Sequence, residues 1–195
     1  MASFGLRRPR FAPIKTETDT ALPTYGTPVT IGRSIKADLS VNFASGKLFA
    51  DDALAENVEE FSSGALAMET DDITDEVAEM IYGATVVNGL VDYKAGDSPP
   101  PGGVCYYKVL KRQGKTLYKG YYYPRAQAKI GNDSAQTKGD NITFGTSSTA
   151  FTIFQANTGT WRQTEEFTDE KKVVEWCDKK LGVTGTPTDP EDPEE

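Results

Sequence analysis

Between Ser34 and Phe43 the chain alternates strictly between apolar and polar side chains. The apolar positions are Ile35, Ala37, Leu39, Val41 and Phe43, and the polar positions between them are Lys36, Asp38, Ser40 and Asn42. Successive side chains of a strand point to opposite faces of a sheet, so this pattern predicts a strand with one buried face and one wet face. The water on the polar face belongs either to bulk solvent or to a channel shared by several subunits.

A second alternating segment, residues 65–70, places Leu66 and Met68 on one face and Ala65, Ala67 and Glu69 on the other. Between the two strands, Ala44-Ser45-Gly46 predicts a bend, and residues 47–49 extend the chain toward the acidic turn at 51–52. Residues 57–61 predict another extended segment, and Ser62-Ser63-Gly64 predicts a break.

Two amphipathic helices are predicted. The first covers residues 75–82, begins with acidic side chains that suit the positive end of the helix dipole, and is ended by Gly83. Its apolar side chains share a face that is expected to cover the sheet: Val77, Met80 and Ile81. The second covers residues 169–181 and carries lysines in its last turns.

Residues 104–123 predict a hairpin with its tip at 112–115. The preceding residues 95–103, with prolines and glycines at 99–103, predict a rigid turn or loop. Six tyrosines crowd this region: Tyr106, Tyr107, Tyr118, Tyr121, Tyr122 and Tyr123. They could form a stacking platform for bases or sugars. Half-buried strand side chains are the alternative, which the strand propensity of tyrosine favours.

Composition narrows the class of protein. The chain has 195 residues, enough for one sizeable core, and a formal net charge of −8, which argues against a protein that grips nucleic acid. No apolar run reaches the roughly 20 residues of a membrane helix, and the first residues lack the apolar core of a signal peptide. We therefore expect synthesis in a cytoplasm. Cys105 and Cys177 are interpreted as reduced and buried, with a disulfide as the alternative.

The residues of common catalytic and metal sites are missing. There is no histidine, which removes the usual general base and most zinc or iron sites. Acidic pairs occur at 51–52, 59–60 and 71–72, where turns or strand ends leave them solvated. No calcium-loop pattern and no glycine-rich phosphate loop is present. We expect no cofactor, no metal and no enzymatic activity.

The order of several motifs resembles that of a known family. The motifs are the turn Leu48-Phe49-Ala50-Asp51-Asp52, the run Glu60-Phe61-Ser62-Ser63-Gly64, the helix start at 71–77, and the runs at 108–115 and 135–140. Together they resemble the major tail proteins, or tail tube proteins, of long-tailed phages with non-contractile tails. The resemblance extends from Phe4 to Leu181.

This resemblance implies a mainly β fold, a tail-tube β-sandwich or barrel with a flanking α-helix and a C-terminal helix. It implies a structural virion protein whose hexameric rings stack into a hollow tube, with strands of neighbouring subunits joined edge to edge. Genomic DNA would pass through the lumen without specific binding. The other implied partners are a tape measure protein, a tail terminator and a distal tail protein.

Three sets of site residues follow from the resemblance. The expected lumen-facing residues are Lys36, Asp38, Ser40, Asn42, Ala65, Ala67 and Glu69. The expected contacts between stacked rings are Leu48, Phe49, Asp51, Asp52 and Glu56. Three arginines of an N-terminal arm are expected to meet the acidic surface of a neighbouring subunit: Arg7, Arg8 and Arg10. A negative lumen would repel DNA, although Lys36 argues against a uniformly acidic wall.

The chain accordingly divides into an N-terminal arm (1–24), a tail tube domain (25–182) and a disordered acidic tail (183–195). Pro9, Pro13 and Pro23 are the reason for expecting an arm, because proline discourages helices and internal strands. A loose terminus is the alternative for this segment.

Alternative functions stay open at this stage. A tube subunit of a contractile tail or injection machine would share the ring geometry. A carbohydrate- or receptor-binding β-sandwich would use the tyrosine-rich hairpin and form no tubes. A small hydrolase using a carboxylate pair is the third.

Overall fold

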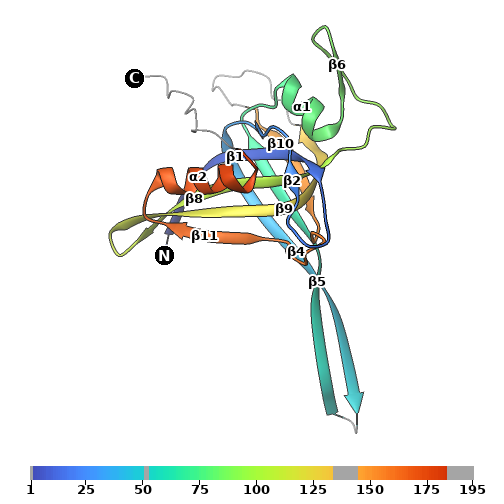
Figure 1. Cartoon of the computed structure of the whole chain (residues 1–195), viewed down its shortest axis with the longest axis vertical. Coiled ribbons are helices and arrows are strands. Elements are labelled where there is room, and N and C mark those ends of the chain that lie inside the picture. The colour runs from blue at the N-terminus through green and yellow to red at the C-terminus, as the bar shows by residue number, and fades with distance from the viewer. Residues whose placement is uncertain (1, 51–52, 134–144, 184–195) are drawn as a thin grey trace, which may run out of the picture.

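The computed structural model describes residues 2–50, 53–133 and 145–183 (Figure 1). Asp51, Asp52, the run 135–140 and all but the first residue of the expected tail 183–195 lie outside these ranges. The predicted fold class is confirmed: the described residues are mainly β, and they contain two helices and an open antiparallel sheet.

The main sheet has the strand order β2-β1-β8-β9-β10-β5-β4, with β11 also pairing β9 and β3 also pairing β1. A separate small hairpin consists of β6 and β7. The strands are β1 (Ala2–Thr16), β2 (Thr24–Tyr25), β3 (Val29–Thr30), β4 (Ser34–Ala50), β5 (Ala53–Thr70), β6 (Thr85–Val87), β7 (Leu90–Asp92), β8 (Pro101–Arg112), β9 (Lys115–Asp133), β10 (Ser147–Ile153) and β11 (Gln163–Phe167).

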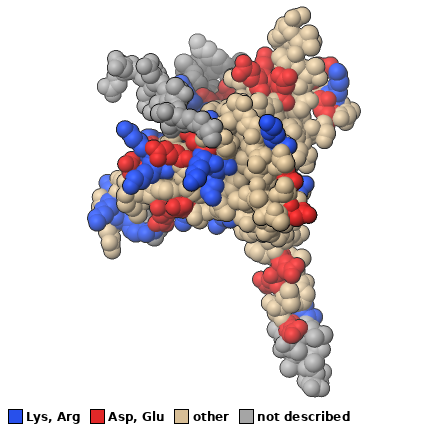
Figure 2. Space-filling model, viewed as in Figure 1, with Lys and Arg blue, Asp and Glu red and all other residues tan. Residues whose placement is uncertain are grey.

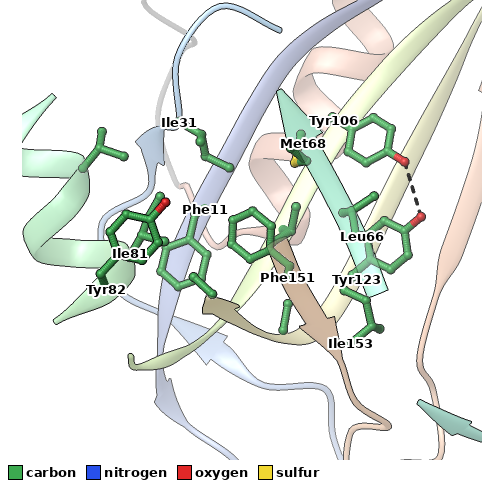
Figure 3. Packing of buried hydrophobic residues seen from close by; sticks show 14 of the residues in the cluster. Phe11, Ile31, Leu66, Met68, Ile81, Tyr82, Tyr106, Tyr123, Phe151 and Ile153 are labelled. Atoms are coloured by element: carbon green, nitrogen blue, oxygen red, sulfur yellow. Dashed lines mark hydrogen bonds between the residues drawn. The ribbon is translucent and has the colours of Figure 1, made fainter. Parts of the chain in front are cut away.

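The main core lies where the sheet bends and packs against itself (Figure 3). Phe11 of β1 stacks on Phe151 of β10, with ring centroids 6.0 Å apart. Leu66 and Met68, both fully buried on β5, belong to the same cluster as Tyr106 of β8. Burial of this apolar surface from both layers is the main force that holds the sheet in its bent shape.

Helix α1 (Asp75–Tyr82) has the bounds that the sequence predicts and covers one end of this core. Val77 and Ile81 are buried, and Met80 is partly buried against the same cluster. The helix ends at Gly83, which has a left-handed φ of 71°. A Cβ at this position would lie 2.9 Å from the carbonyl oxygen of Ser98, so glycine is required on both grounds.

Helix α2 (Glu170–Lys180) covers the outer face of the β1-β8-β9 layer. Asp169 caps its first turn by accepting a hydrogen bond from the backbone N–H of Lys171. Trp176 lies directly over Gly120 of β9, where a Cβ would come within 2.7 Å of the indole ring. The small residue in the strand therefore allows the large one in the helix to approach.

The predicted N-terminal arm is wrong for residues 2–16, which form β1 within the main sheet. Phe11 and Ala12 are fully buried there, and β1 pairs along β8. The prolines are accommodated by local irregularity. Arg8 and Pro9 form a bulge opposite a single residue of β8, and the carbonyl of Pro9 accepts a hydrogen bond from Ile31.

The predicted turn or loop at 95–103 is wrong for its last three residues. Pro101–Gly103 begin β8, and the two glycines are buried. A Cβ on Gly102 would lie 2.3 Å from the ring of Phe11, so this glycine serves close packing rather than a turn. Prolines and glycines in sequence predict a turn here, whereas the tertiary contact with β1 determines the extended conformation.

The hairpin predicted at 104–123 is confirmed, with its tip at Gln113 and Gly114, both of which have positive φ. The tyrosines behave mostly as strand side chains. Tyr106, Tyr107, Tyr122 and Tyr123 are buried, and Tyr118 and Tyr121 are partly buried.

The predicted bend at 44–46 and break at 62–64 are wrong. Strands β4 and β5 form one long hairpin that pairs from Ser34 opposite Thr70 to Ala50 opposite Ala53. The register shifts between Asn42 and Phe43, where β5 carries the extra residue Ser62. Gly46 and Gly64 remain inside the ladder. Glycine allows many backbone conformations, but cross-strand pairing holds these two residues in the extended one.

Candidate assembly surface

The seven predicted lumen-facing residues share one exposed face of the β4–β5 pair. Directly paired positions bring Lys36 opposite Glu69, Asp38 opposite Ala67, and Ser40 opposite Ala65. All seven side chains are exposed except that of Glu69, which is partly exposed. The opposite face carries the buried Leu66 and Met68, so the alternation of the sequence is realised as one dry and one wet face. That the wet face lines a lumen stays a prediction.

Strands β10 and β9 extend this face with residues that the sequence analysis did not assign to it. Ser148, Ala150 and Thr152 of β10 lie opposite Glu69, Ala67 and Ala65. Lys129 of β9 lies opposite Ala150 on the other side. The signal was present, because these β10 residues alternate with buried Phe151 and Ile153. The register between distant strands, however, is set only in the folded sheet.

The polar face carries few charges and they are of both signs. Lys36 and Asp38 form an exposed ion pair at 2.5 Å along one strand. The hydrogen bond and charge of Asp38 raise the pKa of Lys36. Glu69 and Lys129 contribute one charge of each sign, and the remaining positions are Ala, Ser, Thr and Asn. The predicted acidic character is therefore not a property of this described face.

Each side of the polar face ends in an unpaired strand edge. On one side, no described strand pairs with the outer edge of β4. On the other side, β8 pairs β9 only as far as Gln127, so residues 128–133 have no described partner opposite β10. Exposed hydrophobic side chains lie at both edges: Ile35 and Phe43 on β4, and Ile130 on β9. Unpaired edges of this kind are templates for pairing with another chain.

The far half of the β4–β5 hairpin, residues 43–50 and 53–61, projects from the body as an arm (Figure 1). We call this segment the arm. Of the five predicted inter-ring residues, Leu48 pairs with Glu56 and Phe49 pairs with Leu54 in the arm backbone. Glu56 is exposed, whereas Asp51 and Asp52 lie outside the described residues.

The prediction that three arginines extend from a free N-terminal segment to a neighbouring subunit is corrected. Arg7 forms an ion pair with Glu170 of α2 at 2.8 Å, and Arg10 pairs with the buried Asp178 of the same helix. Arg8 is half-buried in the β1 bulge. The acidic groups expected on a neighbouring subunit are, for Arg7 and Arg10, supplied by the same chain, because β1 lies under α2.

A cleft of about 920 Å³ lies at the start of α2, lined by residues that include Tyr107, Glu170 and Lys171. Glu170 accepts hydrogen bonds from the Tyr107 hydroxyl at 2.6 Å and from Arg7 at 2.8 Å. Burial of Tyr107 raises the pKa of its hydroxyl, and the Glu170 carboxylate raises it further. These groups neutralise one another and fasten α2 to β1 and β8. The arrangement is that of a structural network.

Within residues 2–50, 53–133 and 145–183, no cluster of three or more potential metal ligands occurs. None of the helices there has the length and apolar character needed to cross a bilayer.

Comparison with models of known protein families finds none that matches the chain. Comparison with curated proteins also finds no match. Function must therefore be argued from the polar face, its two edges and the arm.

Proposed function

We propose that this protein is a structural virion protein that polymerises as stacked rings into a hollow phage tail tube. One observation carries the proposal: a polar sheet face bounded on both sides by unpaired strand edges. A subunit of this kind can close a ring by pairing the β4 edge of one copy with the 128–133 edge of β9 in the next. Closure removes both edges and converts the four strands of each copy into part of one barrel.

The two faces of this sheet support the same orientation. The face that carries Leu66, Met68 and Phe151 is filled by the core and by β1, so it is not free to line a channel. The opposite face is left for the interior of the ring. The hexameric number comes from the family resemblance, as do the tape measure, terminator and distal tail proteins proposed as partners.

The chemistry of the polar face suits the passage of DNA without binding. Non-specific binding of DNA needs clustered Lys and Arg that release counterions from the phosphates. Here the few charges are of both signs, and the Lys36 ammonium is held by Asp38. We propose that the DNA slides past a nearly neutral wall of small polar side chains, and that the protein, made in the host cytoplasm, ends in the virion tail.

Electron microscopy of the purified full chain tests the proposal. We expect rings or hollow tubes. A single labelling experiment adds the orientation: the variant Ser40→Cys is assembled and then exposed to a polyethylene-glycol maleimide too large to enter a narrow tube. The matched control is Glu175→Cys on the exposed side of α2. The native Cys105 and Cys177 are buried.

We expect assembled Ser40→Cys to be protected and assembled Glu175→Cys to react, while both react in the unassembled protein. Equal reaction of both positions in tubes would place the polar face outside and overturn the lumen assignment. A monodisperse monomer under all assembly conditions would instead favour the β-sandwich binding module.

A further inference from the structure

The arm is supported by its own subunit at its base, where Phe61 stacks on Trp161 with ring centroids 4.5 Å apart. Its side chains between Phe43 and Lys47, and between Glu56 and Glu60, are exposed on both faces of the hairpin. Phe43 and Val58 are 57% and 53% exposed, which is unusual for large apolar side chains in a strand. A two-stranded hairpin is at best marginally stable in water. The arm is therefore built to be completed by contact with another surface.

The charge of the arm restricts what that surface can be. Glu56, Glu59 and Glu60 are exposed, and no described cation forms an ion pair with them. The residues of β4 that face Glu59 and Glu60 are Ser45 and Ala44, which offer no compensating charge. Acidic side chains are visible along the arm in Figure 2. Lys47 is the one cation among the described side chains of the arm, so the arm is net acidic and favours a basic complementary surface.

The end of the β8–β9 hairpin is such a surface. It carries five basic residues and no acidic one between residues 108 and 119: Lys108, Lys111, Arg112, Lys115 and Lys119. Glu166 of β11 holds Arg112 and Lys119, and Lys108 lies over the Tyr106 and Tyr121 rings. Lys111 and Lys115 are exposed and have no ion-pair partner in the described part of the chain.

The two surfaces point in different directions from the body (Figure 1). One chain therefore cannot bring its own arm onto its own β8–β9 hairpin. The helix α1 end of the molecule is excluded as a target for the arm by charge, because Asp75, Glu76 and Glu79 are exposed there. Two acidic surfaces repel each other at short range.

We propose that the acidic arm of one copy docks on the basic end of the β8–β9 hairpin of another copy. Glu59 and Glu60 lie near Lys111 and Lys115 in the contact, and Phe43 and Val58 provide its apolar part. Because two different surfaces meet, the contact is heterologous and propagates from copy to copy. This inference rests on the proposed tube function and names the surface that receives the arm between rings.

The first test is zero-length cross-linking with a carbodiimide, which joins a carboxylate to an amine that it touches. A mixture of unlabelled and ¹⁵N-labelled wild-type chains separates contacts between copies from contacts within one copy. We expect mixed-isotope peptides that join Glu59 or Glu60 to Lys111 or Lys115. Absence of these peptides under conditions that cross-link other surfaces of the assembly contradicts the proposal.

The second test exchanges the charges. The arm variant Glu59→Lys/Glu60→Lys and the hairpin variant Lys111→Glu/Lys115→Glu should each associate about tenfold more weakly in low salt, since attraction at two exposed pairs becomes repulsion. The chain with all four substitutions restores opposite charges and should associate nearly as the wild type does. Sedimentation velocity measures association, and circular dichroism verifies the fold. Glu79→Lys/Glu175→Lys is the matched control for the arm variant, because it makes the same change of net charge at exposed helix positions.

The outcomes separate this inference from the tube function. If tubes form but the fourfold variant associates no better than either double variant, the arm docks elsewhere and the tube function stands. If no tubes form but the cross-links and the charge exchange behave as expected, the docking stands and the tube function fails. If the control variant associates as weakly as the arm variant, net charge alone explains the weaker association and the docking proposal is overturned.

Discussion

One hairpin, β4–β5, contains two regions of opposite character. In the near half, Leu66 and Met68 are fully buried and the other face is polar. In the far half, the arm, Phe43 and Val58 are more than half exposed, and residues 43–47 and 56–60 are uncovered on both faces. The backbone ladder continues through both halves with three register shifts. The difference shows that strand pairing alone does not indicate where a protein is stable. Local stability depends on whether the side chains of the paired strands are buried.

The largest expected effect concerns the tyrosines of the body, because the arm contains none. The Tyr122 hydroxyl donates to the Tyr25 oxygen, and Tyr25 donates to the carbonyl of Pro124 at 2.7 Å. Burial raises the pKa of Tyr122 to about 12, and burial likewise raises the pKa of Tyr25 and of Tyr106.

In the unfolded chain these tyrosines lose their protons near pH 10, whereas the folded chain keeps them protonated to higher pH. Below pH 10 both states are protonated and there is no effect. Between pH 10 and about 12 the unfolded state binds fewer protons, so the free energy of unfolding falls as pH rises, by about 4 kcal/mol per pH unit for the three groups. Circular dichroism and tyrosinate absorbance should change together. Tyrosines that titrate near pH 10 without loss of structure would contradict this.

A smaller effect compares two positions on the same strand. Leu66→Ala removes a fully buried side chain from the core and should lower the free energy of unfolding by about 3 kcal/mol. Val58→Ala, in the exposed arm, should change it by less than about 0.5 kcal/mol. Urea denaturation of the unassembled chain measures both. Equal losses would mean that the arm is packed against the body after all.

The smallest effect is expected on the polar face. Asp38→Asn removes the partner of Lys36, but both side chains are exposed, so the urea midpoint should coincide with that of the wild type. NMR titration should show the pKa of Lys36 returning toward its usual value. A clear loss of stability would show that the polar face stabilises the subunit rather than serving contacts or passage outside it.

Several elements could be predicted from the sequence because their signals are local. The α1 bounds follow from acidic residues, an apolar face and Gly83, and the hairpin tip at Gln113 and Gly114 follows from turn chemistry. The polar face of β4 and β5 follows from alternation alone. The three arginines were misassigned because their partners on α2 lie far along the chain. No local pattern indicates that Pro9 will be absorbed by a bulge.

The sequence by itself determined which side chains share a face of each strand, since successive side chains of a strand point to opposite faces. It also determined the mainly β class and both helices. Only the tertiary structure decided that β1 belongs to the sheet, that β10 and β9 extend the polar face, and that the far half of β4–β5 leaves the body. Those features depend on which distant segments pair and pack, and the free energy of such contacts is not carried by any single segment.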